Sequence, residues 1–287
     1  MKLHLPLSLL ATLLACTLLG APAAQAVEIP SGYTAEYLAD PSELYDYRST
    51  SYNRAFILDS SVSFSPSTAT WWKNGDLKSS GSILFTIEED GDPYSLSFKD
   101  ASYQAFDVTT LRIEDIGKVS FTGINTTTGS SSYSAIEASS ISLLRNREVN
   151  ISNNRQSSGD GYYDPMGGAI YTTSSLEINE NTRGVTISAN RATQNISFSY
   201  GTYYSYAYGG AIYGGSASIS LDGNSGGLSI SGNYASSSLR DSSSSRDGSK
   251  AYSYSNGGAI YGGSSASISL DGNSGGVTIS GNYASSS

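Results

Sequence analysis

The chain has 287 residues, a formal net charge of −9, and an unusual richness in glycine (31) and tyrosine (22). The acidic balance argues against nucleic acid or an anionic lipid surface as a partner. The single histidine, His4, and the single cysteine, Cys16, both lie near the N-terminus. A chain that loses this leader has no residues for Ser-His-Asp triads, thiol chemistry, disulfides or His- or Cys-ligated metals, and we expect no cofactor.

Residues 1–26 have the features of a secretory signal peptide. Lys2 precedes an apolar stretch, Leu3–Leu19, and the small-residue sequence Ala24–Ala26 follows, which predicts cleavage after Ala26. A membrane anchor is the alternative interpretation, but Pro6 interrupts the apolar stretch, which is also short for a bilayer span. Leu13–Cys16 resembles a lipoprotein processing box as well, and the small-residue site fits better. We therefore expect an exported protein.

Residues 27–103 lack the repeats that follow them. They contain both tryptophans, Trp71 and Trp72, and two strand-like runs, Ile83–Ile87 and Tyr94–Phe98. We expect this region to cap a solenoid, and a small separate β domain with a binding role remains the alternative. The alternative draws on a cluster of five tyrosines: Tyr33, Tyr37, Tyr45, Tyr47 and Tyr52.

Residues 104–287 are repetitive. Residues 208–238 and 256–287 are near-copies, residues 167–190 are a more diverged copy, and two degenerate copies start at Ser134 and Gln104. Each copy contains three short runs in which apolar residues occupy every second position, as in a β-strand with one buried face.

Aligning the copies places apolar residues in columns. The first column is Phe106, Ile136, Ile170, Ile212 and Ile260; the second pairs Leu111 with Ile113, Ile141 with Leu143, Leu176 with Ile178, Ile219 with Leu221 and Ile268 with Leu270; the third pairs Val119 with Phe121, Val149 with Ile151, Val185 with Ile187, Leu228 with Ile230 and Val277 with Ile279. One coil cannot bury its apolar face alone, but stacked coils share a continuous core. The pattern predicts an all-β fold, a right-handed parallel β-helix of about five coils. Because the chain stops within a repeat, we expect it to be truncated.

Asparagines recur after each third run, at Asn154, Asn190, Asn233 and Asn282. We expect them to form a hydrogen-bonded ladder at a corner and to tolerate the left-handed conformation there, rather than to bind a ligand. Asp222 and Asp271 lie in the turn sequence DGNSGG and are expected to serve the turn rather than bind calcium. No metal site is predicted.

The sequence GGAI occurs three times, each time followed by I-S-x-N. It comprises Gly167, Gly168, Ala169 and Ile170; Gly209, Gly210, Ala211 and Ile212; and Gly257, Gly258, Ala259 and Ile260. This pattern resembles the chlamydial polymorphic outer membrane proteins, which carry paired GGAI and FxxN motifs; here Ile187, Ile230 and Ile279 stand at the Phe position. The resemblance implies an autotransporter passenger that a C-terminal barrel, not present in this chain, carries across the outer membrane. It also implies adhesion at the cell surface.

The segment before the second GGAI combines tyrosine with serine and glycine, a mixture suited to adaptable contact surfaces. We predict an adhesive loop with Tyr203, Tyr204, Tyr206 and Tyr208 as contact residues, although these tyrosines could instead pack on the solenoid side. The expected partner is a protein or glycan on a host or neighbouring cell. A structural or self-associating surface protein is the alternative. A polysaccharide-active enzyme is a lesser alternative, because no column collects two or three acidic residues that face one groove, and no catalytic residue is predicted.

Overall fold

The computed structural model describes residues 29–47, 49–50, 52–66, 77–87, 94–128, 134–159, 164–198, 202–241 and 250–287. The signal peptide with Ala26, and Trp71 and Trp72 of the expected cap, lie outside the described residues. Within the described ranges, the only helix is a short 3-10 helix, η1 (Pro41–Tyr47), and every paired strand is parallel to its partner. None of the described segments forms a helix long and apolar enough to span a membrane.

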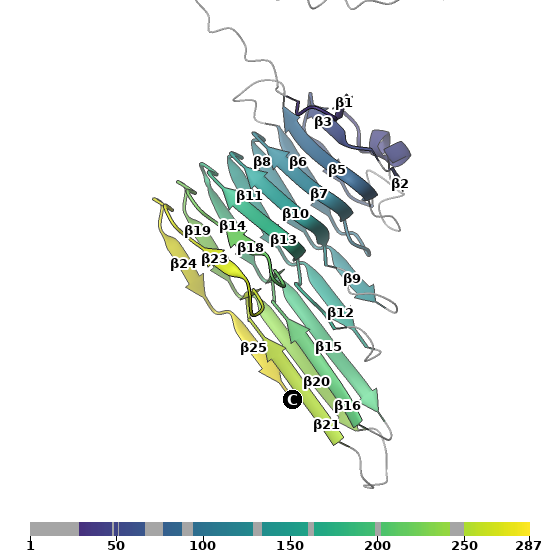
Figure 1. Cartoon of the computed structure of the whole chain (residues 1–287), viewed down its shortest axis with the longest axis vertical. Helices are drawn as coiled ribbons and strands as arrows, with labels where there is room; N and C mark the ends of the chain where they lie inside the picture. Colours follow the sequence, from purple (N-terminus) through teal and green to yellow (C-terminus); the bar gives the residue numbers. More distant parts are fainter. Residues whose placement is uncertain are drawn as a thin grey trace, which may run out of the picture.

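Two long parallel sheets make the body of the molecule (Figure 1). Sheet A runs in the order β1 (Thr34–Leu38), β3 (Arg54–Leu58), β5 (Leu77–Ile87), β7 (Phe106–Glu114), β10 (Ile136–Leu144), β13 (Ile170–Asn179), β17 (Ile212–Tyr213) and β22 (Ile260–Tyr261), with β2 (Ser49–Thr50), β18 (Ser218–Ser220) and β23 (Ser267–Ser269) beside this path. Sheet B runs from β4 (Val62–Phe64) through β6 (Ser95–Lys99), β8 (Lys118–Thr122), β11 (Glu148–Ser152), β14 (Gly184–Ser188) and β19 (Leu228–Ser231) to β24 (Val277–Ser280). The predicted parallel β-helix is confirmed.

The registers match the aligned columns. Ile136 lies between Phe106 and Ile170, and the same column continues through Ile212 to Ile260. The residue pairs of the third column, such as Val149 with Ile151, stack in sheet B from β8 to β24. One expectation is wrong: in the earlier copies the first two predicted strands form one continuous strand, such as β13. The two strands are separate only in the last two copies, where glycines follow the tyrosine of GGAIY. In the first of these, Gly215 takes a positive φ of 51° just after the end of β17.

The hydrophobic core lies between sheets A and B. Phe98 of sheet B packs its ring against Phe64 and Phe121 of the neighbouring strands, with ring centroids 4.9 Å apart in each pair. It also meets Phe106 of sheet A edge-on at 4.9 Å. All four side chains are fully buried, and burial of each stabilises the fold by roughly 1.5–3 kcal/mol. Further along, isoleucine replaces phenylalanine in the same column.

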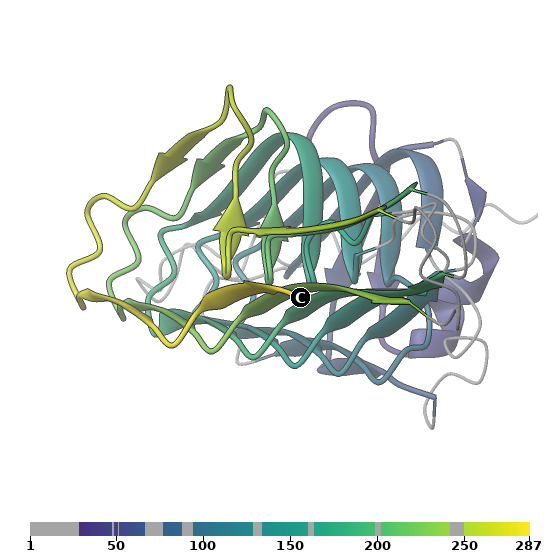
Figure 2. The same cartoon turned by 90° about the horizontal axis from the view of Figure 1, so that it is seen from below.

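The region expected as a cap or a separate domain contributes to both sheets. Strands β1, β3 and β5 extend sheet A, and β4 and β6 extend sheet B, so the described part of residues 27–103 shares the core of the repeats. Figure 2 shows the coils one behind another along this continuous stack. Tyr37 and Tyr52 of the N-terminal tyrosine cluster are exposed.

Two further sheets were not recognised from the sequence. Sheet C consists of β9 (Asn125–Thr128), β12 (Arg155–Ser158), β15 (Arg191–Phe198), β20 (Tyr234–Asp241) and β25 (Tyr283–Ser286), and sheet D pairs β16 (Thr202–Tyr208) with β21 (Lys250–Asn256). Strands β15, β16, β20 and β21 extend together toward the lower end of Figure 1. The predicted adhesive loop with Tyr203, Tyr204, Tyr206 and Tyr208 is therefore wrong as a loop, because these residues lie in β16. These strands are rich in Ser and Tyr and contain few aliphatic residues, such as Ile196 and Leu239, so the aliphatic alternation that marks the other strands is weak in them.

Candidate functional site

The predicted asparagine ladder is present at the corner between sheets B and C. The Nδ2 of Asn190 donates to the carbonyl of Ile151 at 2.9 Å, and its Oδ1 accepts the backbone N–H of Asn154 at 3.1 Å. Asn154, Asn233 and Asn282 repeat the pattern in their own coils. The residue in the left-handed region is the one before each ladder position, such as Ala189 (φ 54°), and not the asparagine itself. The ladder holds coils together and leaves no polar group of these asparagines for a ligand.

A second asparagine ladder, missed in the sequence, occupies the corner between sheets A and B. It consists of Asn146, Asn181, Asn224 and Asn273. The Nδ2 of Asn181 donates to Leu143 O at 3.2 Å and to the Oδ1 of Asn224 at 2.9 Å. The spacing between the second and third apolar pairs would have revealed this column. Both ladders satisfy buried backbone groups at corners where strand pairing stops.

The GGAI motif forms the third corner, where the chain enters sheet A. Gly209 has a positive φ of 59°, and a Cβ on Gly210 would lie 2.1 Å from the carbonyl oxygen of Gly258 and 2.4 Å from the nitrogen of Tyr234. The two glycines therefore let neighbouring coils and the start of β20 approach closely. Ala211 and Ile212 of the same motif are fully buried. GGAI is a structural motif in this chain.

Strand β16 is held in place by its inward-facing residues. Ser205 and Ala207 are fully buried, and Gln194 of β15 accepts hydrogen bonds through its Oε1 from the Ser205 hydroxyl at 3.0 Å and from the Tyr206 N–H at 2.5 Å. Ser253 of β21 likewise donates to the carbonyl of Ser237 in β20 at 2.9 Å. Sheet D thus packs on sheet C through small residues, and the alternate residues of β16 and β21 point the other way.

Those alternate residues are tyrosines. Tyr204 stacks on Tyr252 and Tyr206 stacks on Tyr254, with ring centroids 5.1 Å apart in both pairs. Along β16 the rings are also nearly parallel, at 6.2 Å between Tyr204 and Tyr206 and 6.0 Å between Tyr206 and Tyr208. The exposed fractions of Tyr204, Tyr252 and Tyr254 are 47%, 38% and 43%. Sheet D therefore presents a grid of ordered, partly solvent-exposed rings.

A second row of tyrosines continues this grid on sheet A. Tyr171, Tyr213 and Tyr261 each follow the isoleucine of GGAI and stack in register, at 5.4 Å and 5.6 Å between successive rings. Tyr208 joins the rows, because its ring lies 6.0 Å from Tyr213 and 5.0 Å from Tyr261. We call the continuous surface the tyrosine face: Tyr171, Tyr204, Tyr206, Tyr208, Tyr213, Tyr252, Tyr254 and Tyr261.

The structure corrects the predicted contact loop in two respects. Tyr204, Tyr206 and Tyr208 belong to the tyrosine face, but they lie on a strand. Tyr203 points to the opposite side of β16 and stacks on Phe198 at 5.0 Å, so it is not part of this face. Two repeated patterns could have revealed the missing members: a tyrosine follows all three GGAI motifs, and Tyr252 and Tyr254 repeat the Y-S-Y pattern of β16.

Burial and nearby charge affect the phenols of the tyrosine face. Burial, and then the negative charge of Asp164, raise the pKa of Tyr208 from 10.0 to about 12. Burial also raises the pKa of Tyr213, with neighbouring tyrosines and Asp164 adding to it, and the pKa of Tyr171, with Glu137 adding to it. These phenols are neutral at physiological pH.

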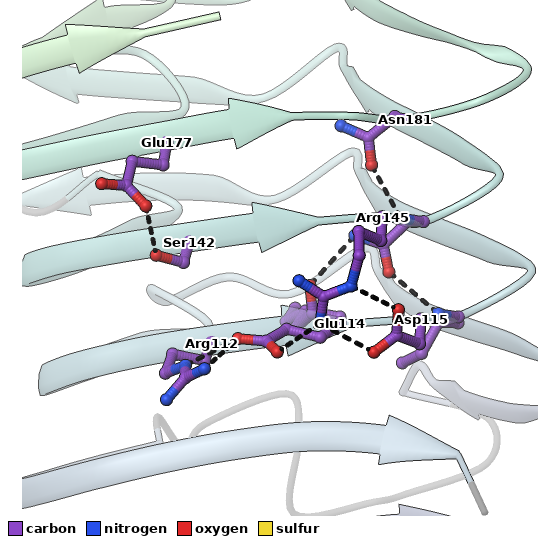
Figure 3. Close-up of polar contacts among 10 residues, drawn as sticks. Arg112, Glu114, Asp115, Ser142, Arg145, Glu177 and Asn181 are labelled. Atoms are coloured by element: carbon purple, nitrogen blue, oxygen red, sulfur yellow. Dashed lines mark hydrogen bonds and ion pairs between the residues drawn. The ribbon is translucent and has the colours of Figure 1, made fainter. Parts of the chain in front are cut away.

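The densest group of charges lies elsewhere, on sheet A (Figure 3). Arg145 donates to both carboxylate oxygens of Asp115, at 2.8 and 2.9 Å, and to Glu114 at 2.9 Å. Arg112 donates to the other oxygen of Glu114 at 2.6 Å. The neighbouring carboxylates, with burial opposing them, raise the pKa of Arg145. The group links adjacent coils, and both carboxylates are engaged in ion pairs.

The aspartates of the DGNSGG turns also act within the fold. Asp222 accepts hydrogen bonds from the hydroxyls of Ser220 and Ser269, at 2.7 and 2.8 Å, and from the N–H of Asp271 at 2.6 Å. Across the described ranges, no three His, Cys, Asp or Glu side chains are grouped as they would be to hold a metal ion.

A shallow groove of about 360 Å³ runs along the start of the strands of sheet B. Its floor is glycine backbone, including Gly184, Gly227 and Gly276, with Arg183 and Glu148 at its margin. It contains no aromatic side chain and no cluster of acidic residues, so the tyrosine face is the stronger candidate site.

Fold and site together define a parallel β-solenoid protein with an aromatic surface on one flank. In comparisons with known proteins, no family model, no curated protein and no solved structure matches the chain.

Proposed function

We propose that this chain is the passenger part of an exported bacterial surface protein and that it acts as an adhesin through its tyrosine face. The observation that carries the proposal is the continuous ring contact of eight tyrosines across sheets A and D. The partner is a protein or glycan on a host or neighbouring cell. The chain itself is located at the outer membrane, on the cell surface or in the extracellular space.

The physical support is that tyrosine supplies a large contact area at low entropic cost, together with a hydroxyl for hydrogen bonds. Here the backbone that carries the rings is already fixed in strands, and Gln194 anchors β16 from behind. A partner would therefore bind without ordering a loop, which removes one cost of association. The signal peptide predicted for residues 1–26 and the resemblance of the GGAI repeats to polymorphic outer membrane proteins are the grounds for proposing export and a surface location.

We propose no catalytic role. Glu114 and Asp115, two neighbouring carboxylates, both accept hydrogen bonds from Arg145 and are held in ion pairs. Turnover of a polysaccharide by the purified chain would contradict this part of the proposal.

The test is attachment of beads coated with the purified chain to cultured cells. Replacing Tyr204 and Tyr206 by serine should reduce attachment severalfold, because aromatic anchors supply much of the energy of a contact. Tyr283→Ser is the matched control, since Tyr283 is 56% exposed and belongs to sheet C. Circular dichroism and resistance to proteolysis establish that each variant is folded. Equal attachment of a folded double variant would favour the alternative of a structural or self-associating surface protein.

A further inference from the structure

The tyrosine face is bordered by carboxylates. In sheet A, Tyr171 pairs in register with Glu137, and Glu137 pairs with Asp107, so the tyrosine column continues directly into two acidic residues. Asp164 lies close enough to Tyr208 and Tyr213 for its charge to raise the pKa of both phenols. Among the described residues of the strands that carry the face, β13, β16, β17, β21 and β22, Lys250 at the start of β21 is the only cation. The surface thus combines aromatic rings with negative charge.

From these observations we infer that the tyrosine face binds an extended, arginine-bearing cationic segment of its partner. The inference rests on the proposed function and names the chemistry that the face recognises. A guanidinium group is planar and weakly hydrated. It stacks on aromatic rings, and its N–H groups donate to phenol oxygens and carboxylates. The face offers all three kinds of contact within one continuous surface.

The spacing of the rings fits an extended partner. Successive tyrosines along β16 lie 6.2 and 6.0 Å apart. In an extended chain, side chains on one face repeat about every 6.6 Å. A segment with arginine at every second position, lying along β16, would therefore bring each guanidinium to a successive ring. Glu137 lies beside Tyr171 in sheet A, and the charge of Asp164 acts on Tyr206, Tyr208 and Tyr213, so both carboxylates would add attraction for the same segment.

The experiment measures binding of a fluorescent oligo-arginine peptide to the full chain by polarisation, at low and at high NaCl concentration. We expect saturable binding that weakens as salt rises, because screening reduces attraction between exposed charges. Replacing Tyr204 and Tyr206 by leucine should weaken binding about tenfold, since each exposed ring contributes a modest cation–π attraction. The corresponding phenylalanine double variant keeps the rings and should bind within about twofold of the parent chain.

Asp164→Asn tests the charge while keeping the shape, and it should weaken binding severalfold at low salt but little at high salt. Tyr283→Leu, on sheet C, should leave binding unchanged. An oligo-glutamate peptide of the same length should not bind. The inference is overturned if the leucine and phenylalanine variants bind oligo-arginine equally, if oligo-glutamate binds as well, or if only a neutral polysaccharide binds in a way that depends on Tyr204 and Tyr206.

The peptide assay tests the cationic partner and the bead assay tests adhesion, so the failure of one proposal can be told apart from the failure of the other. Attachment of beads that depends on Tyr204 and Tyr206, without binding of oligo-arginine, would leave the adhesin proposal intact and overturn the cationic partner. Peptide binding that depends on the same tyrosines, with attachment unaffected, would support the chemistry of the face and contradict its role in adhesion.

Discussion

The side-chain amide of Asn190 donates to the side-chain oxygen of Asn233 in the next coil at 3.0 Å, and that oxygen also accepts the backbone N–H of Asn190 at 3.0 Å. One amide group therefore satisfies two donors of the preceding coil, and its own Nδ2 reaches the carbonyl of Ile187 at 3.0 Å. Because both asparagines are fully buried, water cannot replace these bonds.

The first prediction concerns this ladder. Asn190→Ala should lower the free energy of unfolding by about 2 kcal/mol, because the buried N–H of Asn154 would lose the side-chain oxygen that accepts it. Asn282→Ala should cost less, since Asn282 is itself only partly buried and its hydrogen bonds to Asn233 are part-buried rather than fully buried. Urea unfolding followed by circular dichroism measures both. Equal losses of unfolding free energy in the two variants would contradict the prediction that the buried hydrogen bonds of Asn190 stabilise the fold more than those of Asn282.

The second prediction concerns the core column. Ile212→Asp should destabilise the chain by about 5 kcal/mol or more, because it buries an unpaired charge between sheets A and B. Tyr213→Ser, one residue along, should cost about 1 kcal/mol through lost ring contacts. Ile212→Val is the conservative control, with a cost of about 1 kcal/mol. Limited proteolysis should cut the aspartate variant rapidly and the other two slowly; similar rates for all three would contradict the assignment of strand faces.

The third prediction concerns the second glycine of GGAI. Gly210→Ala should cost about 3 kcal/mol, because the new methyl group would meet backbone atoms of Gly258 and Tyr234 that cannot rotate away. Gly159→Ala is the matched control, since its methyl group would lie 3.8 Å from the nearest atom, the carbonyl oxygen of Asn195. This control should be neutral or slightly stabilising. Thermal unfolding of the two variants distinguishes close backbone approach from a general loss of glycine flexibility.

The fourth prediction concerns alkaline pH. The folded chain holds the phenol proton of Tyr208 more tightly than the unfolded chain does, because its pKa is raised from 10.0 to about 12. The resulting stabilisation is complete below the unfolded value and is lost as the pH rises through the folded value. The free energy of unfolding should therefore fall between pH 10.0 and about 12. Tyr208→Phe should make this fall shallower, whereas Tyr283→Phe should not; urea titrations across this pH range measure it, and parallel curves for Tyr208→Phe and the parent chain would exclude the effect.

The repeats determined the core columns and their register in advance. Ile170, Ile212 and Ile260 stack as their alignment requires, because aliphatic side chains at every second position have one way to be buried when coils stack. The ladder of Asn154, Asn190, Asn233 and Asn282 could be predicted for a similar reason, since a polar residue at a repeated corner must bond along the stack. These features follow from periodicity along the chain.

Only the tertiary structure decided where the tyrosines lie. Sheets C and D are rich in small polar residues and tyrosine and have only a weak aliphatic alternation. The strand character of β16 depends on its pairing with β21 from the next coil. Tyr208 and Tyr261 are far apart in the sequence, and their rings come within 5.0 Å only because the coils stack and sheet D folds back beside sheet A. The repeated GGAIY and Y-S-Y patterns show which tyrosines recur, but which rings become neighbours across separate coils is set by how the chain is stacked.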